Sequence, residues 1–262
     1  MPELPEVEIY RRYFERHALG QTIARVDVRD ERILGAIRGA SLGRRLQGRA
    51  FHAVRRHGKH LIAEADEGLW LHLHFGMTGD LAYYTDPADE PRFARVVFEL
   101  VNGARLAYDD MRLFGVVGLV SGPEDLIAAH RLGPDPLDPG FRLSDFARLV
   151  ERRRGTVKSF LLSQNIIAGM GNLYADETLF QTAIDPRRSV NRLTTGEVKA
   201  VFERMRAILR EAIRRKSRGA GHPRSYLVHR REAGERCPRC GGTIRKSVVF
   251  GRSTYFCAKH QR

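Results

Sequence analysis

The chain has 262 residues, of which 42% are hydrophobic, and Lys plus Arg outnumber Asp plus Glu by 45 to 31. The net charge of +14 favours a polyanionic partner, with nucleic acid the first candidate and a membrane surface the alternative. No apolar run approaches the roughly 18–20 residues that a bilayer span needs, and no signal peptide precedes Pro2. All three cysteines follow residue 236, which argues against a disulfide framework and points to a metal site in the reducing cytoplasm.

The chain begins Met-Pro-Glu-Leu-Pro-Glu, and removal of the initiator methionine before proline is expected to leave Pro2 as a free secondary amine. An α-amino group titrates near pH ~8, so part of it is unprotonated at neutral pH and can attack an electrophilic carbon to form an imine. Glu3 supplies the carboxylate that general acid–base catalysis requires. Pro5 suits the first turn of a helix predicted over residues 5–19, so a simple helix start is the alternative interpretation.

A β-rich region follows this helix. Residues 69–75 alternate strictly, which predicts a strand with Leu69, Leu71, Leu73 and Phe75 on one core face. Further strands are predicted over 94–101, 105–108 and 116–120, with a hairpin turn at 102–103. The pattern predicts an α+β protein whose N-terminal domain, residues 1–131, is a β-sandwich with a flanking helix.

Beyond residue 131 the pattern becomes helical. The Gly- and Pro-rich segment 132–141 is the predicted linker. Helices are predicted over 144–153, 157–164 and 197–215, the last with apolar residues at i, i+3, i+4 spacing. Segment 216–236 is polar and basic and is predicted to be a mobile loop. We therefore expect a helical domain over residues 142–233, followed by a small module over residues 234–262.

Two ligand pairs with the same spacing lie in this last module. Cys237 and Cys240 form the first pair, and Cys257 and His260 form the second. Such pairs on hairpin turns suit tetrahedral zinc, and structural zinc sites accept Cys₃His as well as Cys₄. A module without a core of its own folds only on its metal. We predict one structural zinc ion, with free thiols beside an incidental histidine as the alternative.

The turn at residues 169–172 has the composition of an anion site. Gly169 and Gly171 let backbone amides approach a phosphate closely, and the helix that follows offers its N-terminal N–H groups. Asn172 adds an uncharged donor. Such a turn is weak evidence by itself, but the match described next covers residues 169–180 without a break.

Together, the N-terminal motif, residues 169–180 and the Cys/His module resemble the formamidopyrimidine-DNA glycosylase/endonuclease VIII family of base-excision-repair enzymes. Leu4 makes the N-terminal motif more similar to that of the formamidopyrimidine branch than to that of the endonuclease VIII branch. The resemblance implies a β-sandwich, a helix-two-turn-helix domain and a zinc hairpin. It also implies that Pro2 attacks C1′ of a damaged nucleotide, that Glu3 transfers protons, and that Lys59 reaches the lesion phosphate and sugar.

The resemblance further implies a set of DNA contacts. Segments 74–79 and 110–115 match the two loops that enter the duplex, where an extruded base leaves a gap to be filled. The implied wedges are Met77 and Phe114, with Arg112 facing the unpaired base and His74 as a further DNA contact on the first loop. Lys158 and Asn172 are implied to contact the DNA backbone, and Arg252, at the zinc-hairpin tip, to bind phosphates. Glu177 is expected to orient the turn.

The chain departs from the family pattern at three positions. Met111 and Leu113 stand where the family has proline and arginine, which leaves the opposite-base preference open. His260 stands where the family usually has the fourth cysteine.

The predicted activity is that of a bifunctional glycosylase and AP lyase that removes oxidised purines, 8-oxoguanine and formamidopyrimidines, by β,δ-elimination. We expect a monomer that acts on double-stranded DNA and, as a bacterial-type protein, associates with the nucleoid. Segment 216–236 is shorter than the loop that covers a flipped purine in that branch, which favours oxidised pyrimidines or abasic sites as the alternative. A non-catalytic, zinc-dependent damaged-DNA-binding protein is a third hypothesis, which the combination of Pro2, Glu3 and Lys59 disfavours.

Overall fold

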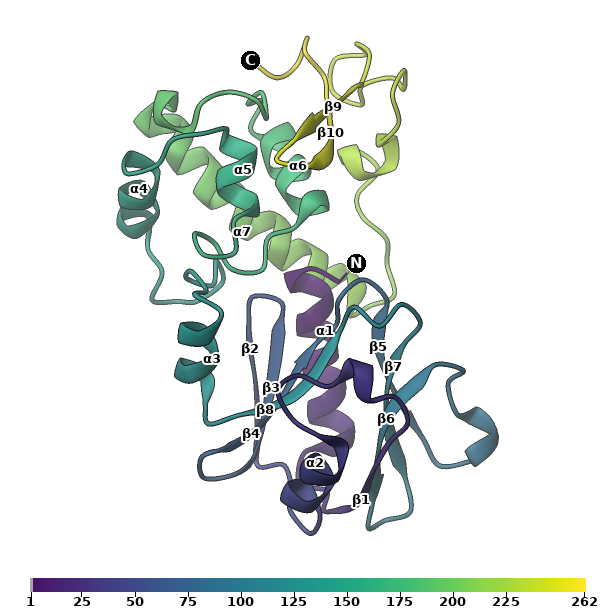
Figure 1. The fold of residues 1–262 in the computed structure, drawn as a ribbon. Helices are drawn as coiled ribbons and strands as arrows, with labels where there is room; N and C mark the ends of the chain where they lie inside the picture. Colours follow the sequence, from purple (N-terminus) through teal and green to yellow (C-terminus); the bar gives the residue numbers. More distant parts are fainter. Residues whose placement is uncertain (1) are drawn as a thin grey trace. The chain divides into compact units, whose positions relative to one another are not determined.

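The computed structural model describes residues 2–262, which divide into a first compact unit ending at His130 and a second beginning at Arg131 (Figure 1). Each unit has its own buried core. Among the described residues, no helix is both long enough and apolar enough to cross a membrane.

Two four-stranded antiparallel sheets form the first unit (Figure 1). One has the strand order β1 (Ile23–Val28), β6 (Ala94–Leu100), β7 (Arg105–Asp110), β5 (Gly79–Tyr84). The other has the order β2 (Ala53–His57), β3 (His60–Asp66), β4 (Leu69–His74), β8 (Val116–Val120). Residues of both sheets, such as Leu71 and Phe98, share one apolar core. The predicted α+β class with an N-terminal β-sandwich is confirmed.

In strand β4, the alternating pattern predicted one buried face correctly but did not predict that the other face is buried too. Leu69, Leu71 and Leu73 do lie in the shared core, as predicted. The opposite face is buried as well, because Trp70 packs with Ile62 of β3 and Leu126 of helix α3 (Pro123–Ala129). The sequence did not predict α3, nor the short helix α2 (Gly39–Leu46), whose two glycines lower its intrinsic helix propensity.

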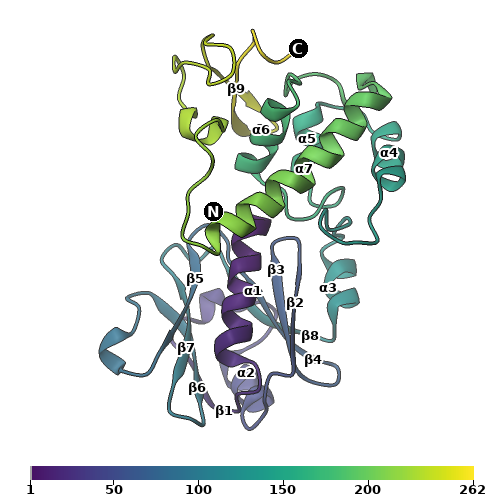
Figure 2. The same ribbon diagram turned by 180° about the vertical axis from the view of Figure 1, so that it is seen from behind.

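Helix α1 (Leu4–Ala18) runs between the two sheets and contacts β2, β3 and β5 (Figure 2). Val7, Phe14 and Ala18 form its buried stripe. At its start, the Glu6 carboxylate accepts a hydrogen bond of 2.9 Å from the backbone N–H of Glu3, which satisfies a donor that the helix leaves unpaired. Pro2 therefore lies immediately before the N-cap of α1, whose first turn is fixed by this hydrogen bond.

The second unit contains four helices: α4 (Leu143–Glu151), α5 (Val157–Leu162), α6 (Asn172–Gln181) and α7 (Thr195–Lys216). Helix α7 contacts α4 and α6. It begins with a capping box in which the Thr194 N–H donates to Glu197 Oε2 at 2.8 Å and the Glu197 N–H donates to Thr194 Oγ1 at 3.3 Å. The three predicted helices are present with their ends shifted by one or two residues.

Two segments expected to be irregular have defined contacts. In the predicted linker, the Gly133 N–H donates to the Gln164 carbonyl, and the Pro134 carbonyl accepts from the Ala168 N–H, so this stretch packs within the second unit. The segment predicted as a mobile loop contains a 3₁₀ helix, η4 (Leu227–Arg230), that contacts α6.

Three further 3₁₀ turns are η1 (Glu31–Ile33), η2 (Pro87–Asp89) and η3 (Val190–Arg192).

The chain closes with an antiparallel hairpin of β9 (Arg245–Val249) and β10 (Arg252–Phe256). Strand β10 packs on helix α6 (Figure 1). The hairpin is therefore attached to the same helix that follows the glycine-containing turn at 169–171.

Candidate active site and DNA-contacting residues

The N-terminal segment joins two candidate catalytic residues directly to α1. Pro2 is half-buried, and Glu3 is only 3% exposed, at the N-cap position of the helix. A buried carboxylate next to an amine has the arrangement that proton transfer during imine chemistry requires.

Lys59 lies in the two-residue turn that joins β2 to β3, where Gly58 has a φ of 57°. Arg56, on β2, places this hairpin against α1 through an ion pair of 3.2 Å with Glu8. Burial raises the pKa of Glu8, but hydrogen bonds from Arg11 and Arg12 and the charges of Arg11 and Arg56 outweigh it and bring that pKa below its ordinary value. The Glu8 carboxylate is thus ionised and links the helix that carries Pro2 to the hairpin that carries Lys59.

A cluster of four histidines lies beside Lys59. The sequence had indicated only one of them, His74, as a site residue. Its other members are His60, His72 and His130, and the Nδ1 of His60 lies 2.9 Å from the Nε2 of His72. Burial, followed by the charges of Lys59 and His130, lowers the pKa of His74 to about 4. Burial and the neighbouring histidines lower the pKa of His60 to about 2 and that of His72 to about 3. The rings of His60, His72 and His74 are therefore neutral at physiological pH.

The candidate wedge residues lie on two loops, the β4–β5 loop (residues 75–78) and the β7–β8 loop (residues 111–115). Met77 is 39% exposed and Phe114 is 54% exposed, unusual for side chains of this size. The guanidinium of Arg112 stacks over the Phe114 ring, 4.8 Å from its centroid. Leu113, between them, has a φ of 55° and packs against the core. The loop therefore turns Arg112 and Phe114 outward together.

The two loops approach each other so closely that they require glycine. A Cβ added at Gly76 would lie 2.3 Å from the carbonyl carbon of Phe114, and one added at Gly115 would lie 1.8 Å from the Tyr108 hydroxyl oxygen. That hydroxyl donates a hydrogen bond of 2.8 Å to the His74 carbonyl. The backbone around the wedge candidates is thus tightly packed.

In the second unit, the turn before α6 is held by Gln164. Its Oε1 accepts from the Gly169 N–H at 2.9 Å, and its Nε2 donates to the Met170 carbonyl at 2.7 Å. Asn172, the first residue of α6, donates from Nδ2 to the Ser253 carbonyl of β10 at 2.9 Å. Its Oδ1 is buried and has no hydrogen-bond partner among the described residues.

Lys158 has a different setting from the phosphate contact that the resemblance implied. Its side chain is fully buried, and its Nζ lies 2.5 Å from Asp176 Oδ1 and 2.7 Å from Thr254 Oγ1. Arg231 contacts the other carboxylate oxygen of Asp176 at 2.7 Å. Burial raises the pKa of Asp176, and the positive charges of Lys158 and Arg231 oppose this shift. Lys158 therefore joins α5, α6 and the zinc hairpin, whereas Arg252 is exposed at the start of β10.

Glu177 is buried at the next position of α6. Its carboxylate accepts hydrogen bonds from Gln181 Nε2 at 2.7 Å and from the Val228 N–H of η4 at 3.1 Å. Burial raises the pKa of Glu177 to about 7, although these hydrogen bonds oppose the shift. The carboxylate holds η4 against α6.

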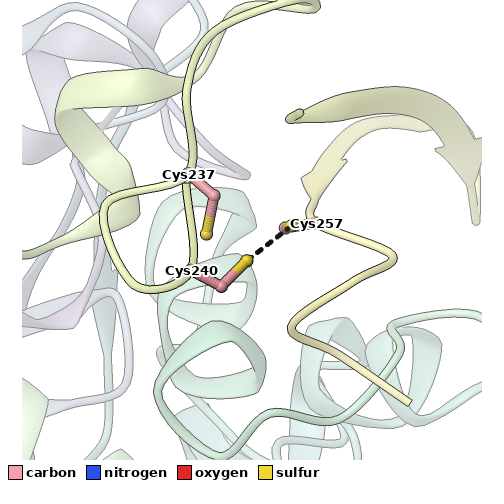
Figure 3. Close-up of side chains that lie close together, drawn as sticks. All are labelled: Cys237, Cys240 and Cys257. Atoms are coloured by element: carbon pink, nitrogen blue, oxygen red, sulfur yellow. Dashed lines mark hydrogen bonds between the residues drawn. The ribbon is translucent and has the colours of Figure 1, made fainter. Parts of the chain in front are cut away.

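Three cysteine thiols converge in the C-terminal module (Figure 3). The sulfur atoms of Cys237, Cys240 and Cys257 all lie within 4.8 Å of one another, and those of Cys240 and Cys257 are 3.6 Å apart. Tetrahedral zinc with Zn–S bonds of ~2.3 Å places its ligand sulfurs about 3.8 Å apart, so the donor set fits this metal. The predicted single structural zinc is confirmed by this cluster together with the zinc-finger match reported below.

The structure places His260 outside the sulfur cluster. Its Nε2 lies 2.9 Å from the Phe180 carbonyl oxygen, and its ring lies 4.8 Å from the Phe180 ring. The turn that precedes it is well defined, because the backbone N–H groups of His260 and Gln261 both donate to the Cys257 carbonyl.

Three family models match consecutive parts of the chain. Residues 1–117 match the formamidopyrimidine-DNA glycosylase N-terminal domain, residues 132–223 its H2TH domain, and residues 234–259 the zinc finger found in FPG and IleRS. A formamidopyrimidine-DNA glycosylase of Nocardioides sp. (strain ATCC BAA-499 / JS614) is 40% identical over 98% of this chain and 93% of the relative. The protein of the same name from Paracoccus denitrificans (strain Pd 1222) is 38% identical over 98% of each chain.

Solved structures agree with these matches. The Lactococcus lactis Fpg in complex with Fapy-dG-containing DNA has a TM-score of 0.89 and 29% identity, and the match covers 99% of this chain and 100% of that one. Another complex of that protein, with DNA containing an abasic site, gives a TM-score of 0.88 at 29% identity over 99% of each chain.

An N-terminal β-domain, an H2TH domain and a zinc finger, with a proline and a glutamate before the first helix, define a DNA glycosylase with AP lyase activity that takes part in base-excision repair. The chain belongs to the formamidopyrimidine-DNA glycosylase family.

Proposed function

We propose that this enzyme excises oxidised purines, 8-oxoguanine and formamidopyrimidines, from double-stranded DNA and then cleaves the strand at the abasic site. The observation that carries the proposal is the arrangement of Pro2, buried Glu3 and the Lys59 hairpin around α1. The relatives named formamidopyrimidine-DNA glycosylase support the purine class.

In the first step the Pro2 nitrogen, free after loss of the initiator methionine, attacks C1′, and the N-glycosidic bond breaks with its electron pair leaving on the base. Glu3 accepts the proton that the attacking amine loses and passes it to the ring oxygen O4′, which opens the sugar and gives an iminium ion between Pro2 and C1′. The departing base takes a proton from water. Met1 lies outside the described residues, so intact-protein mass spectrometry is the check on this amine.

Strand cleavage follows from the iminium ion. Its positive charge acidifies the C2′ hydrogens, so loss of one proton breaks the C3′–O3′ bond and releases the 3′ phosphate. A second proton loss breaks the C5′–O5′ bond, and water then hydrolyses the imine and regenerates Pro2. Lys59 neutralises charge on the phosphate beside the reacting sugar, a role that suits its place next to neutral His74.

For DNA contacts, we propose that Met77 and Phe114 fill the gap left by the extruded base and that Arg112 donates to the orphaned partner base. His74 and Asn172 contact the backbone near the lesion, and Arg252 binds flanking phosphates. Lys158 serves the same interface by holding β10 on α6 through Asp176.

We also propose His260 as the fourth zinc ligand. A hydrogen bond from its Nε2–H to the Phe180 carbonyl would leave Nδ1 with the free lone pair, the pairing by which metal-bound histidines are commonly oriented. Cobalt substitution tests this. A His260→Ala variant should lose the tetrahedral absorption spectrum that His260→Cys keeps; an unchanged spectrum in His260→Ala would remove His260 from the site.

One observation favours a second substrate class, oxidised pyrimidines or abasic sites. Only residues 217–226 separate α7 from η4, and the Val228 N–H fixes η4 to Glu177, which limits how far this segment can fold over an extruded purine. Excision rates on 8-oxoguanine and 5-hydroxyuracil duplexes compare the two classes directly.

The domain boundaries that we propose are 1–131, linker 132–141, 142–233 and 234–262, and we place a monomeric enzyme on nucleoid DNA in the cytoplasm. The experiment that tests the proposed chemistry uses Pro2→Leu, which retains the initiator methionine. This variant should lose strand cleavage and keep its affinity for a duplex with a non-cleavable abasic analogue. Retained cleavage would contradict the role of Pro2.

A further inference from the structure

Asp110, the last residue of β7, lies behind the exposed wedge candidates and has no part in the chemistry described above. Its side chain is fully buried. A carboxylate in such a position is costly unless each oxygen accepts hydrogen bonds, so its partners reveal what it holds.

The partners come from both loops. From the β4–β5 loop, the Thr78 hydroxyl donates to Asp110 Oδ1. From the β7–β8 loop, the Arg112 N–H donates to the same oxygen at 3.1 Å, and the Gly115 N–H donates to Oδ2 at 2.8 Å. The Arg112 N–H also lies 3.1 Å from Thr78 Oγ1, which closes a three-membered network.

These donors flank the three side chains proposed to enter the duplex. Thr78 follows Met77 directly, and the N–H groups of Arg112 and Gly115 fix the β7–β8 loop on either side of Phe114. Such a network gives each loop a single backbone geometry before DNA is bound.

We propose that Asp110 is a positioning residue for base extrusion: it couples the two loops so that Met77, Arg112 and Phe114 enter the stack as one rigid group. The inference rests on the proposed function, because it assigns the loops to extrusion. Pre-organised insertion lowers the cost of unstacking, whereas flexible loops must be ordered at the same moment. The consequence is that Asp110 matters for substrates whose base must be extruded and hardly at all for substrates that have none.

The variant Asp110→Asn keeps the size of the side chain but turns an NH₂ group towards donors. Asp109→Asn is the matched control, because Asp109 accepts a hydrogen bond from the Phe93 N–H and is not part of the network that joins the two loops. Two readouts are compared for each zinc-loaded protein: excision of 8-oxoguanine from a duplex, and borohydride trapping on single-stranded DNA with an abasic site, where nothing has to be extruded.

We expect Asp110→Asn to lower kcat/KM for duplex excision by at least about tenfold, because leaving a buried donor or acceptor without its partner has a free-energy cost of that order. Trapping on the single-stranded abasic DNA should stay within about twofold of the parent protein, and Asp109→Asn should match the parent in both assays. An equal loss in both assays, or no loss in either, would overturn the positioning role.

A second pair of variants keeps the test decisive if Asp110→Asn does not fold. Thr78→Val removes the hydroxyl and should reduce duplex excision selectively, and Thr78→Ser should restore it. Equal activity of the two Thr78 variants on the duplex would contradict the network. Failure of the parent protein itself to form the abasic adduct would instead overturn the proposed imine chemistry, so the two failures are distinguishable.

Discussion

The two units each use a buried aspartate to hold segments that we propose contact DNA, but the aspartates are paired differently. Asp110 in the first unit is satisfied by one hydroxyl and two backbone N–H groups. Asp176 in the second lies between two cations, Lys158 and Arg231. The neutral donors link the two loops of the first unit, whereas the ion pairs join α6 to α5 and to the residue that ends η4.

Burial also shifts the pKa values of different ionisable groups in the two units. The first buries histidines that stay neutral beside Lys59, so their pKa values are lowered. The second buries Glu177, whose pKa is raised. Stability is therefore expected to respond to pH in opposite directions in the two units.

The largest expected effect is acid destabilisation of the first unit. Below pH ~6.5 histidines of the unfolded chain bind protons, while His60, His72 and His74 do so only near or below pH 4 when folded. Stability should fall by up to about 1.4 kcal/mol per pH unit for each such histidine as the pH drops from 6.5 towards 4. Hydrogen exchange of first-unit peptides measures this. His72→Gln should reduce the slope, and the exposed His52→Gln should not.

Removal of one cation from the second network should have the next largest effect. Lys158→Met leaves Asp176 with one ion-pair partner fewer and Thr254 without its donor, which should cost about 3–5 kcal/mol in urea unfolding of the zinc-loaded protein. Lys199→Met is the matched control, because that lysine is exposed and its ion pair with Glu203 is long, at 3.9 Å. A Lys158 variant as stable as this control would contradict a structural role for Lys158.

The smallest effect is expected at Glu177. Its folded pKa of about 7 exceeds the ordinary value of 4.5, so the folded state holds the proton more tightly and stability should fall as the pH rises from 4.5 to 7. Glu177→Gln should flatten this slope while changing stability at pH 7 by about 1 kcal/mol or less. Hydrogen exchange in peptides from α6 and η4 reports both quantities. A slope unchanged by Glu177→Gln would assign it to another group.

Local patterns predicted much of this molecule. The strand over β4, the helix over α7 and the convergence of Cys237, Cys240 and Cys257 all follow from spacing within short segments. The relation of Pro2 to Glu3 is likewise set by adjacency and by the helix start at Leu4.

The sequence could not predict pairings that depend on distant segments. Lys158 meets Thr254 across 96 positions, so a lysine that resembles a phosphate contact proves to be internal. Asp110 reaches Thr78 across 32 positions, and His60 reaches His72 only through the register of β3 and β4. The repeated histidines at 60, 72 and 74 were the available signal, but their burial depends on how the first unit packs around them.

The central claim is that the Pro2 amine forms the covalent intermediate. We would incubate the protein with a duplex carrying 8-oxoguanine opposite cytosine, reduce with borohydride, digest with trypsin and locate the adduct by mass spectrometry. The account predicts an adduct on the peptide that begins at Pro2, with the initiator methionine absent. An adduct on Lys59 or another lysine, or no adduct on this duplex while an abasic duplex reacts, would contradict the proposed nucleophile or the proposed purine substrate, respectively.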